Sequence, residues 1–281
     1  MHERVFVHSE FYTAAQKEFV LVSLDFPRGE EPKAAVPNPQ RNDELMAKYG
    51  VRGFPTVMIV TASGDALGQT GYQDVEPAEY LADVQRIRDE GRQAMLAVKA
   101  LLEEYDNSET KTEVISKATA MLSEMTAESV GVNAVADIVR AGIALTEDVA
   151  EQVALLTALI DVVYPNEADK ELIAKIDPEN EHGLMLIVVL SAMNSLQSEE
   201  DVASWVVLAE KVYATGNIKP SEDSLLLLVT CSFFHFQYLD NKDAAITWAQ
   251  RAQDQGGLDK QMQEYVDELL GTNPFEDEAD F

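Results

Sequence analysis

The stretch YGVRGFPTVMIV, residues 49–60, places a proline directly before an apolar, β-branched run. The run Val57–Val60 is typical of a buried strand. Proline has no backbone N–H, so it interrupts a hydrogen-bonded ladder inside a sheet but is tolerated at the start of a strand. Pro55 therefore predicts the beginning of a strand, with Phe54 in the loop that leads into it.

Helix and strand patterns surround this stretch in a definite order. Before it come a helix over Glu10–Glu18 that Ser9 could cap, a buried parallel strand over Phe19–Phe26, and a short helix closed by Gly50. After it, a turn at Ser63–Asp65 predicts a β-hairpin, and the period then changes to helical over residues 76–91. We expect the first domain to cover residues 1–90.

This order resembles the second half of the thioredoxin fold. The resemblance is carried by the helix end at Tyr49-Gly50 and by Gly53, Pro55, Thr56 and Gly71. It implies a cis peptide bond before Pro55 and a substrate-binding groove at Gly53, Phe54 and Pro55. In that family an extended peptide of a protein substrate pairs with this backbone while a disulfide is exchanged. The plainer alternative is that Pro55 only terminates a loop.

The cysteine pair on which the family's chemistry depends is absent. The family has C-x-x-C at the start of its first helix, where one thiol is a reactive thiolate, but this chain has a single cysteine, Cys231. We therefore predict no catalytic residue and no dithiol chemistry in the chain as given. Cys231 lies among apolar residues and is expected to be a buried, inert thiol.

Alignment to the family places the missing pair just before Met1, so that HERVFV, residues 2–7, resembles the end of the first helix. The preceding family strand, which lies between the strands corresponding to 19–26 and 56–60, is missing too. Unpaired buried backbone groups cost about 1–3 kcal/mol each, against about 5–15 kcal/mol for a whole domain. We expect the sequence to be part of a longer protein. The alternative is that RVFV, residues 4–7, forms a replacement strand in a redox-inactive domain.

The remainder of the chain is predicted to be helical. Residues 91–271 show about nine amphipathic or apolar helices separated by polar breaks, and Ala245, Ala249 and Ala252 resemble the small packing residues of a tetratricopeptide unit. No fixed repeat period continues through them. Residues 272–281 form an acidic tail that we expect to be disordered. The predicted fold is an α/β thioredoxin-like domain, incomplete at its N-terminus, followed by an all-α array of helical hairpins.

Composition excludes several classes of partner. The net charge of −29 would repel nucleic acid and anionic membrane surfaces. The longest apolar run, residues 184–190, is far shorter than the roughly 18 residues that span a bilayer. The histidines, His2, His8, His182 and His235, show no metal-ligand spacing, and no nucleotide-binding fingerprint is present, so no metal and no cofactor are predicted.

Two functions remain open at this stage. One is thiol–disulfide exchange with protein substrates by the full-length protein, with the helical domain as a surface for protein partners or for homodimer formation. The other is a non-enzymatic adaptor that binds protein or peptide clients through the degenerate thioredoxin-like fold and the helices. The visible residues contain no secretory signal, which favours the cytoplasm; a signal peptide upstream would instead make the protein periplasmic or exported.

Overall fold

The structure is a computed structural model that describes residues 5–29, 32 and 35–271, so the predicted acidic tail at 272–281 lies outside it. The chain forms two compact units, Met1–Ile138 and Val139–Phe281. Helices make up most of both units, and the first also contains a small sheet. The described part of the chain thus combines a partial α/β region with a long helical region.

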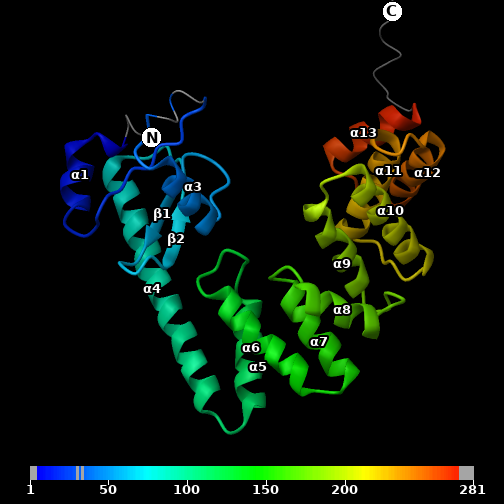
Figure 1. Cartoon of the computed structure of the whole chain (residues 1–281), viewed down its shortest axis with the longest axis horizontal. Helices are drawn as coiled ribbons and strands as arrows, with labels where there is room; N and C mark the ends of the chain where they lie inside the picture. Colours follow the sequence, from blue (N-terminus) through cyan, green and yellow to red (C-terminus); the bar gives the residue numbers. More distant parts are fainter. Residues whose placement is uncertain (1–4, 30–31, 33–34, 272–281) are drawn as a thin grey trace, which may run out of the picture. The chain divides into compact units, whose positions relative to one another are not determined.

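The first unit contains an antiparallel pair of strands (Figure 1). β1 (Val57–Val60) pairs with β2 (Ala66–Thr70), and Val57 lies opposite Thr70. The turn between them is closed by the Thr61 N–H, which donates to the Asp65 carbonyl at 2.8 Å. The predicted β-hairpin is confirmed.

The long helix α4 (Pro77–Asn107) packs against this hairpin. Contact is so close at Gly91 that a β-carbon there would lie 2.0 Å from the Leu67 carbonyl oxygen. Glycine is therefore required at this crossing. The domain boundary expected near residue 90 falls inside α4, because Gly91 serves this contact and does not end the helix.

Two short helices complete the surroundings of the sheet. α1 (Ser9–Ala15) packs on α4, and α3 (Pro39–Lys48) precedes Gly50, whose φ of 63° suits a glycine after a helix end. The core around the sheet consists of apolar side chains from α1 and the turn before it, from the two strands and from the first part of α4: Val5, Phe11, Ala15, Ile59, Leu67, Tyr80, Leu81 and Val84.

The prediction of a buried strand over Phe19–Phe26 is wrong: this segment is neither strand nor helix. Its apolar residues between the ends are exposed, Val20 to 92 % and Val22 to 75 %. The backbone of residues 20–24 makes no hydrogen bond to any described residue. A strand needs a neighbour to pair with, and no described strand lies beside this segment.

Both ends of the segment are nevertheless held in place. The ring of Phe19 packs on the core. The Arg88 guanidinium carbon lies over this ring, 5.2 Å from the ring centroid. At the other end, the Asp25 carbonyl accepts a hydrogen bond from the Asn42 side-chain amide at 3.2 Å. The exposed segment 20–24 is therefore held at both ends, by the contacts of Phe19 and by the hydrogen bond to Asp25.

Residues 5–7 do not form the replacement strand considered for 4–7; Arg4 itself lies outside the described residues. Val5 and Phe6 belong to a helical turn, in which the His8 N–H donates to the Val5 carbonyl at 3.2 Å. A helical turn satisfies its backbone groups locally, whereas a four-residue strand depends on neighbours. Val5 is fully buried in the core of the unit.

After α4 the described chain continues through helices joined by short connections. These helices are α5 (Lys111–Ser123), α6 (Val132–Leu145), α7 (Val149–Ile160), α8 (Glu167–Ile176), α9 (Leu184–Ala192), α10 (Glu199–Ala214), α11 (Glu222–Gln237), α12 (Lys242–Gln255) and α13 (Lys260–Leu270). A 3₁₀ turn at Met193–Ser195 follows α9. Within the described ranges, no helix has the length and apolar character needed to cross a membrane.

α11 and α12 form a closely packed pair in the second unit (Figure 1). The three alanines singled out from the sequence, Ala245, Ala249 and Ala252, are fully buried on α12. The Ser232 hydroxyl of α11 donates to the Ala245 carbonyl at 2.9 Å, which holds the two helices together at that point. Small side chains allow this close approach.

Candidate functional site

The loop that enters β1 contains all three residues predicted for the substrate groove, Gly53, Phe54 and Pro55. The Phe54–Pro55 peptide bond is cis. The Thr56 hydroxyl donates to the Gly53 carbonyl at 2.7 Å and so closes the loop on itself. Gly53, Phe54 and Pro55 are all exposed, which leaves this part of the backbone accessible from solvent.

An aromatic pair lies on one side of the loop. Phe54 is 62 % exposed, and its ring stacks on that of Phe26 with 5.0 Å between the centroids. Phe26 also lines a hollow of about 470 Å³ together with Pro27 and Val36. The loop therefore presents an apolar surface next to accessible backbone, which suits an extended peptide with apolar side chains.

The end of β2 supports the same loop. Val57 pairs with Thr70, and a β-carbon at Gly71 would lie 3.5 Å from the Pro55 carbonyl oxygen. The backbone at residues 70–71 therefore lies against the backbone that carries Pro55.

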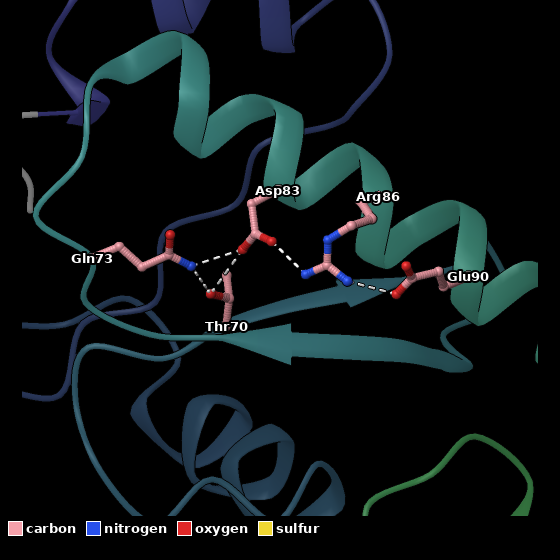
Figure 2. A network of polar contacts seen from close by, with 5 residues as sticks. All are labelled: Thr70, Gln73, Asp83, Arg86 and Glu90. Atoms are coloured by element: carbon pink, nitrogen blue, oxygen red, sulfur yellow. Dashed lines mark hydrogen bonds and ion pairs between the residues drawn. The ribbon is translucent and has the colours of Figure 1, made fainter.

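A polar network fixes the end of β2 to α4, as Figure 2 shows. We call Thr70, Gln73, Asp83 and Arg86 the Asp83 network. The Gln73 side-chain amide donates to the Asp83 carboxylate at 2.7 Å and to the Thr70 hydroxyl at 2.8 Å. Arg86 donates to the other Asp83 oxygen at 2.5 Å and reaches Glu90 at 2.6 Å.

Two ionisable side chains of α4, Asp83 and Tyr80, have shifted pKa values. The hydrogen bond from Arg86 lowers the pKa of Asp83, and Gln73 adds to the effect, so Asp83 is a carboxylate at neutral pH. Burial raises the pKa of Tyr80 to about 12. Neither group is therefore poised to exchange a proton near pH 7.

The single thiol of the chain lies in the second unit. Cys231 is fully buried on α11, and burial raises its pKa far above the ordinary value of a thiol. A thiolate is the reactive form of cysteine. Cys231 is therefore unsuited to disulfide exchange in the folded unit.

Three of the four histidines, His8, His182 and His235, lie among the described residues. His235, on α11, contacts the Glu210 carboxylate at 3.1 Å. Among the described residues, no group of three or more histidine, cysteine or carboxylate side chains is arranged to hold a metal ion. His2 lies outside those residues.

Sequence reasoning located the loop but missed the residues around it. The sequence pattern places Phe26 at the end of a buried strand and gives no signal for Asp83 or Gln73. The Asp83 network carries no local signal, because its members come from a strand end, a loop and a helix. The pairing of Phe26 with Phe54 likewise joins residues 28 positions apart.

Comparison with known proteins gives one informative match. No protein-family model matches the chain, and no solved structure matches it. Over 85 residues, 30 % of this chain, the sequence is 32 % identical to the disulfide bond reductase DsbH of Chlamydia pneumoniae. The match covers 49 % of that relative, so the chain spans about half the length of the curated protein it matches. This similarity supports a distant relationship with a disulfide bond reductase.

Proposed function

We propose that residues 1–90 are part of a thioredoxin-like domain that exchanges thiols and disulfides with protein substrates, and that Gly53, Phe54 and Pro55 bind the substrate peptide. The observation that carries the proposal is the exposed loop at Pro55, closed by Thr56 and lined by the Phe26–Phe54 pair. The match to a disulfide bond reductase supports the reaction type.

The reaction needs a pair of thiols that this chain does not supply. One thiolate attacks a sulfur of the substrate disulfide, forms a mixed disulfide and releases a substrate thiolate; the second thiol then displaces the substrate's other sulfur. The products are a reduced substrate and an oxidised cysteine pair. Because Cys231 is alone and buried, we propose that the pair lies in polypeptide that precedes these residues in a longer protein.

The exposed segment 20–24 supports the same view. It is apolar and β-branched, is anchored at both ends, and has backbone groups with no described partner. A strand from the preceding polypeptide would pair with these groups and cover the side chains. We propose that the sheet is completed in this way in the longer protein.

The first experiment is to determine the native N-terminus by mass spectrometry and to sequence the DNA upstream of the Met1 codon. An in-frame strand followed by C-x-x-C, present in the native protein, is the expected result. The longer protein should then reduce insulin disulfides in the presence of dithiothreitol as the final reductant. A native start at Met1, or a longer protein without reductase activity, would refute the proposal.

The role of the loop is tested in that longer protein with Phe54→Ala. Loss of the exposed ring should raise KM for an unfolded disulfide substrate by about 3- to 10-fold and leave kcat nearly unchanged, because a binding contact is removed. Tyr12→Ala is the matched control, since Tyr12 is a half-exposed aromatic residue on α1. Equal effects of the two changes would place the substrate elsewhere.

A second candidate is the non-enzymatic adaptor, which the burial of the only cysteine favours for the chain as given. In that case the loop and the helical region would bind protein clients without changing their disulfides. The two functions differ in one result: an adaptor binds a reduced and an oxidised client equally and returns both unchanged.

A further inference from the structure

The loop at Pro55 does not rest on apolar packing alone. Pro55 and Phe54 are exposed, and the hairpin strands are only four and five residues long. Short, partly exposed strands fray readily at their ends. The start of β1 therefore needs contacts beyond the strand pairing to stay in position.

We infer that Asp83 is the positioning residue of the Pro55 loop, acting through Thr70 and Gln73 at the end of β2. This inference deepens the proposed function and rests on it for the identity of the loop as a substrate groove. Asp83 does not contact the loop itself. It fixes the backbone on which the loop lies.

The first step runs from α4 to the end of β2. The Asp83 carboxylate accepts a hydrogen bond from Gln73 at 2.7 Å and lies 3.5 Å from the Thr70 hydroxyl (Figure 2). Gln73 also bonds to Thr70, so the three side chains form a closed set. Charge-assisted hydrogen bonds of this kind are stronger than neutral ones.

The second step runs from the end of β2 to the loop. Thr70 pairs with Val57, two residues after Pro55. The next residue, Gly71, lies close to the Pro55 carbonyl. A displacement of residues 70–73 would therefore move the surface against which Pro55 and its neighbours are held.

The third step concerns the orientation of Asp83 itself. Arg86 donates to the Asp83 oxygen that faces away from Gln73, and Glu90 holds Arg86 from the next turn of α4. Arg86 thus fixes the rotamer of Asp83, and of Asp83, Arg86 and Glu90 it is Asp83 that hydrogen-bonds to Thr70 and Gln73. Glu90 belongs to the ion pair but not to the link between helix and sheet.

This difference supplies a matched pair of variants. Asp83→Ala removes the link, and Glu90→Gln removes one ion pair of the same arginine without touching the link. Amide hydrogen exchange, followed by NMR on the chain as it exists, reports both regions. In Asp83→Ala we expect exchange of the protected amides at the open end of the β1–β2 ladder, residues 57–58 and 69–70, to accelerate by about 10-fold, with exchange at Ile59 and Leu67 unchanged. In Glu90→Gln we expect all four regions to stay within about 2-fold of the parent protein.

Two outcomes would overturn the inference. One is the same acceleration in both variants; the other is an acceleration in Asp83→Ala that extends equally to Ile59 and Leu67, which would mean general destabilisation. Should Asp83→Ala fail to fold, Asp83→Asn keeps an acceptor for Gln73 and loses the charge and the oxygen that accepts from Arg86. It should then show an intermediate acceleration confined to the same residues, and an unconfined one would overturn the inference.

The exchange measurement is independent of disulfide chemistry. If the exchange pattern is as expected and the longer protein reduces no disulfide, the proposed function fails while the positioning of the loop stands. If the longer protein is active and Asp83→Ala changes neither the exchange at residues 57–58 and 69–70 nor KM, the inference fails while the proposed function stands.

Discussion

Two apolar runs of similar composition differ in secondary structure and in burial. Residues 184–190, LMLIVVL, form α9, and most of their side chains are buried. Residues 19–24, FVLVSL, form no regular element, and Val20 and Val22 are largely exposed. Both runs are rich in β-branched residues, so local propensity does not account for the difference.

The comparison shows what each kind of element requires from its surroundings. A helix satisfies its own backbone hydrogen bonds, so the run in α9 needs only apolar neighbours to cover its sides. α9 obtains them from α8, α10 and α11. A strand needs another strand for its backbone as well, and the run at 19–24 has none among the described residues.

The sharpest test of this difference is a matched pair of aspartates. Val189→Asp places a charge at a fully buried position of α9 and should destabilise the second unit by about 4 kcal/mol or more. Val20→Asp adds the same charge at an exposed position and should change stability by less than about 0.5 kcal/mol. Urea denaturation followed by tryptophan fluorescence and by circular dichroism measures both.

The same pair also tests the completion of the sheet. In a longer protein whose upstream strand covers residues 20–24, Val20→Asp should become destabilising by more than about 1 kcal/mol. An unchanged stability there would mean that the segment stays exposed.

The next largest effect is expected where α4 crosses β2. Gly91→Ala puts a β-carbon against the Leu67 carbonyl, and backbone atoms cannot move aside as a side chain can. We expect a loss of about 2–3 kcal/mol in the first unit, measured by thermal unfolding. Gly53→Ala is the control, because nothing lies within 4 Å of a β-carbon there; a comparable loss in both would refute the crossing as the cause.

A smaller effect distinguishes the two tryptophans of the second unit. The Trp205 indole N–H donates to the Val189 carbonyl at 2.7 Å, which anchors the buried run of α9 to α10. Trp205→Phe should cost about 1–2 kcal/mol beyond Trp248→Phe, since a buried carbonyl loses its donor. Each variant retains one tryptophan as its fluorescence reporter. Equal losses of stability in the two variants would indicate that the smaller side-chain volume, and not the lost hydrogen bond, causes the destabilisation.

The smallest effect concerns the dependence of stability on pH. The pKa of Asp83 is lowered by Arg86 in the folded state. Its contribution to stability is therefore present above the pKa that the side chain has in the unfolded chain, and is lost as pH falls through the lower folded pKa. Asp83→Asn should flatten the decline in stability of the first unit below pH 4, whereas Asp89→Asn, on the exposed side of α4, should alter it through Arg88 first and Arg92 second.

Prediction from sequence succeeded where the signal was local. The Ser63–Asp65 turn and the apolar strands on each side of it specified the hairpin, and polar breaks separated the helices. The alanines of α12 followed from their spacing. Each of these features depends on neighbours in the chain, so the residues themselves carried the information.

Prediction failed where a partner was decisive. Phe19–Phe26 has every local property of a buried strand, yet strand formation depends on a second segment. The boundary expected near residue 90 falls inside α4, which continues to Asn107, and Gly91 lies where α4 crosses Leu67. The segment at 5–7 is apolar enough for a strand and forms a helical turn.

The amino-acid sequence by itself determined the hairpin behind Pro55, the helical character of the second unit and the absence of a second cysteine, because turn chemistry, periodicity and composition are properties of the chain alone. Only the tertiary structure decided that Phe26 stacks on Phe54, that Asp83 ties the end of β2 to α4 and that residues 20–24 stay uncovered. These outcomes depend on which distant groups meet, and pairing energies between distant groups are not encoded in any local pattern.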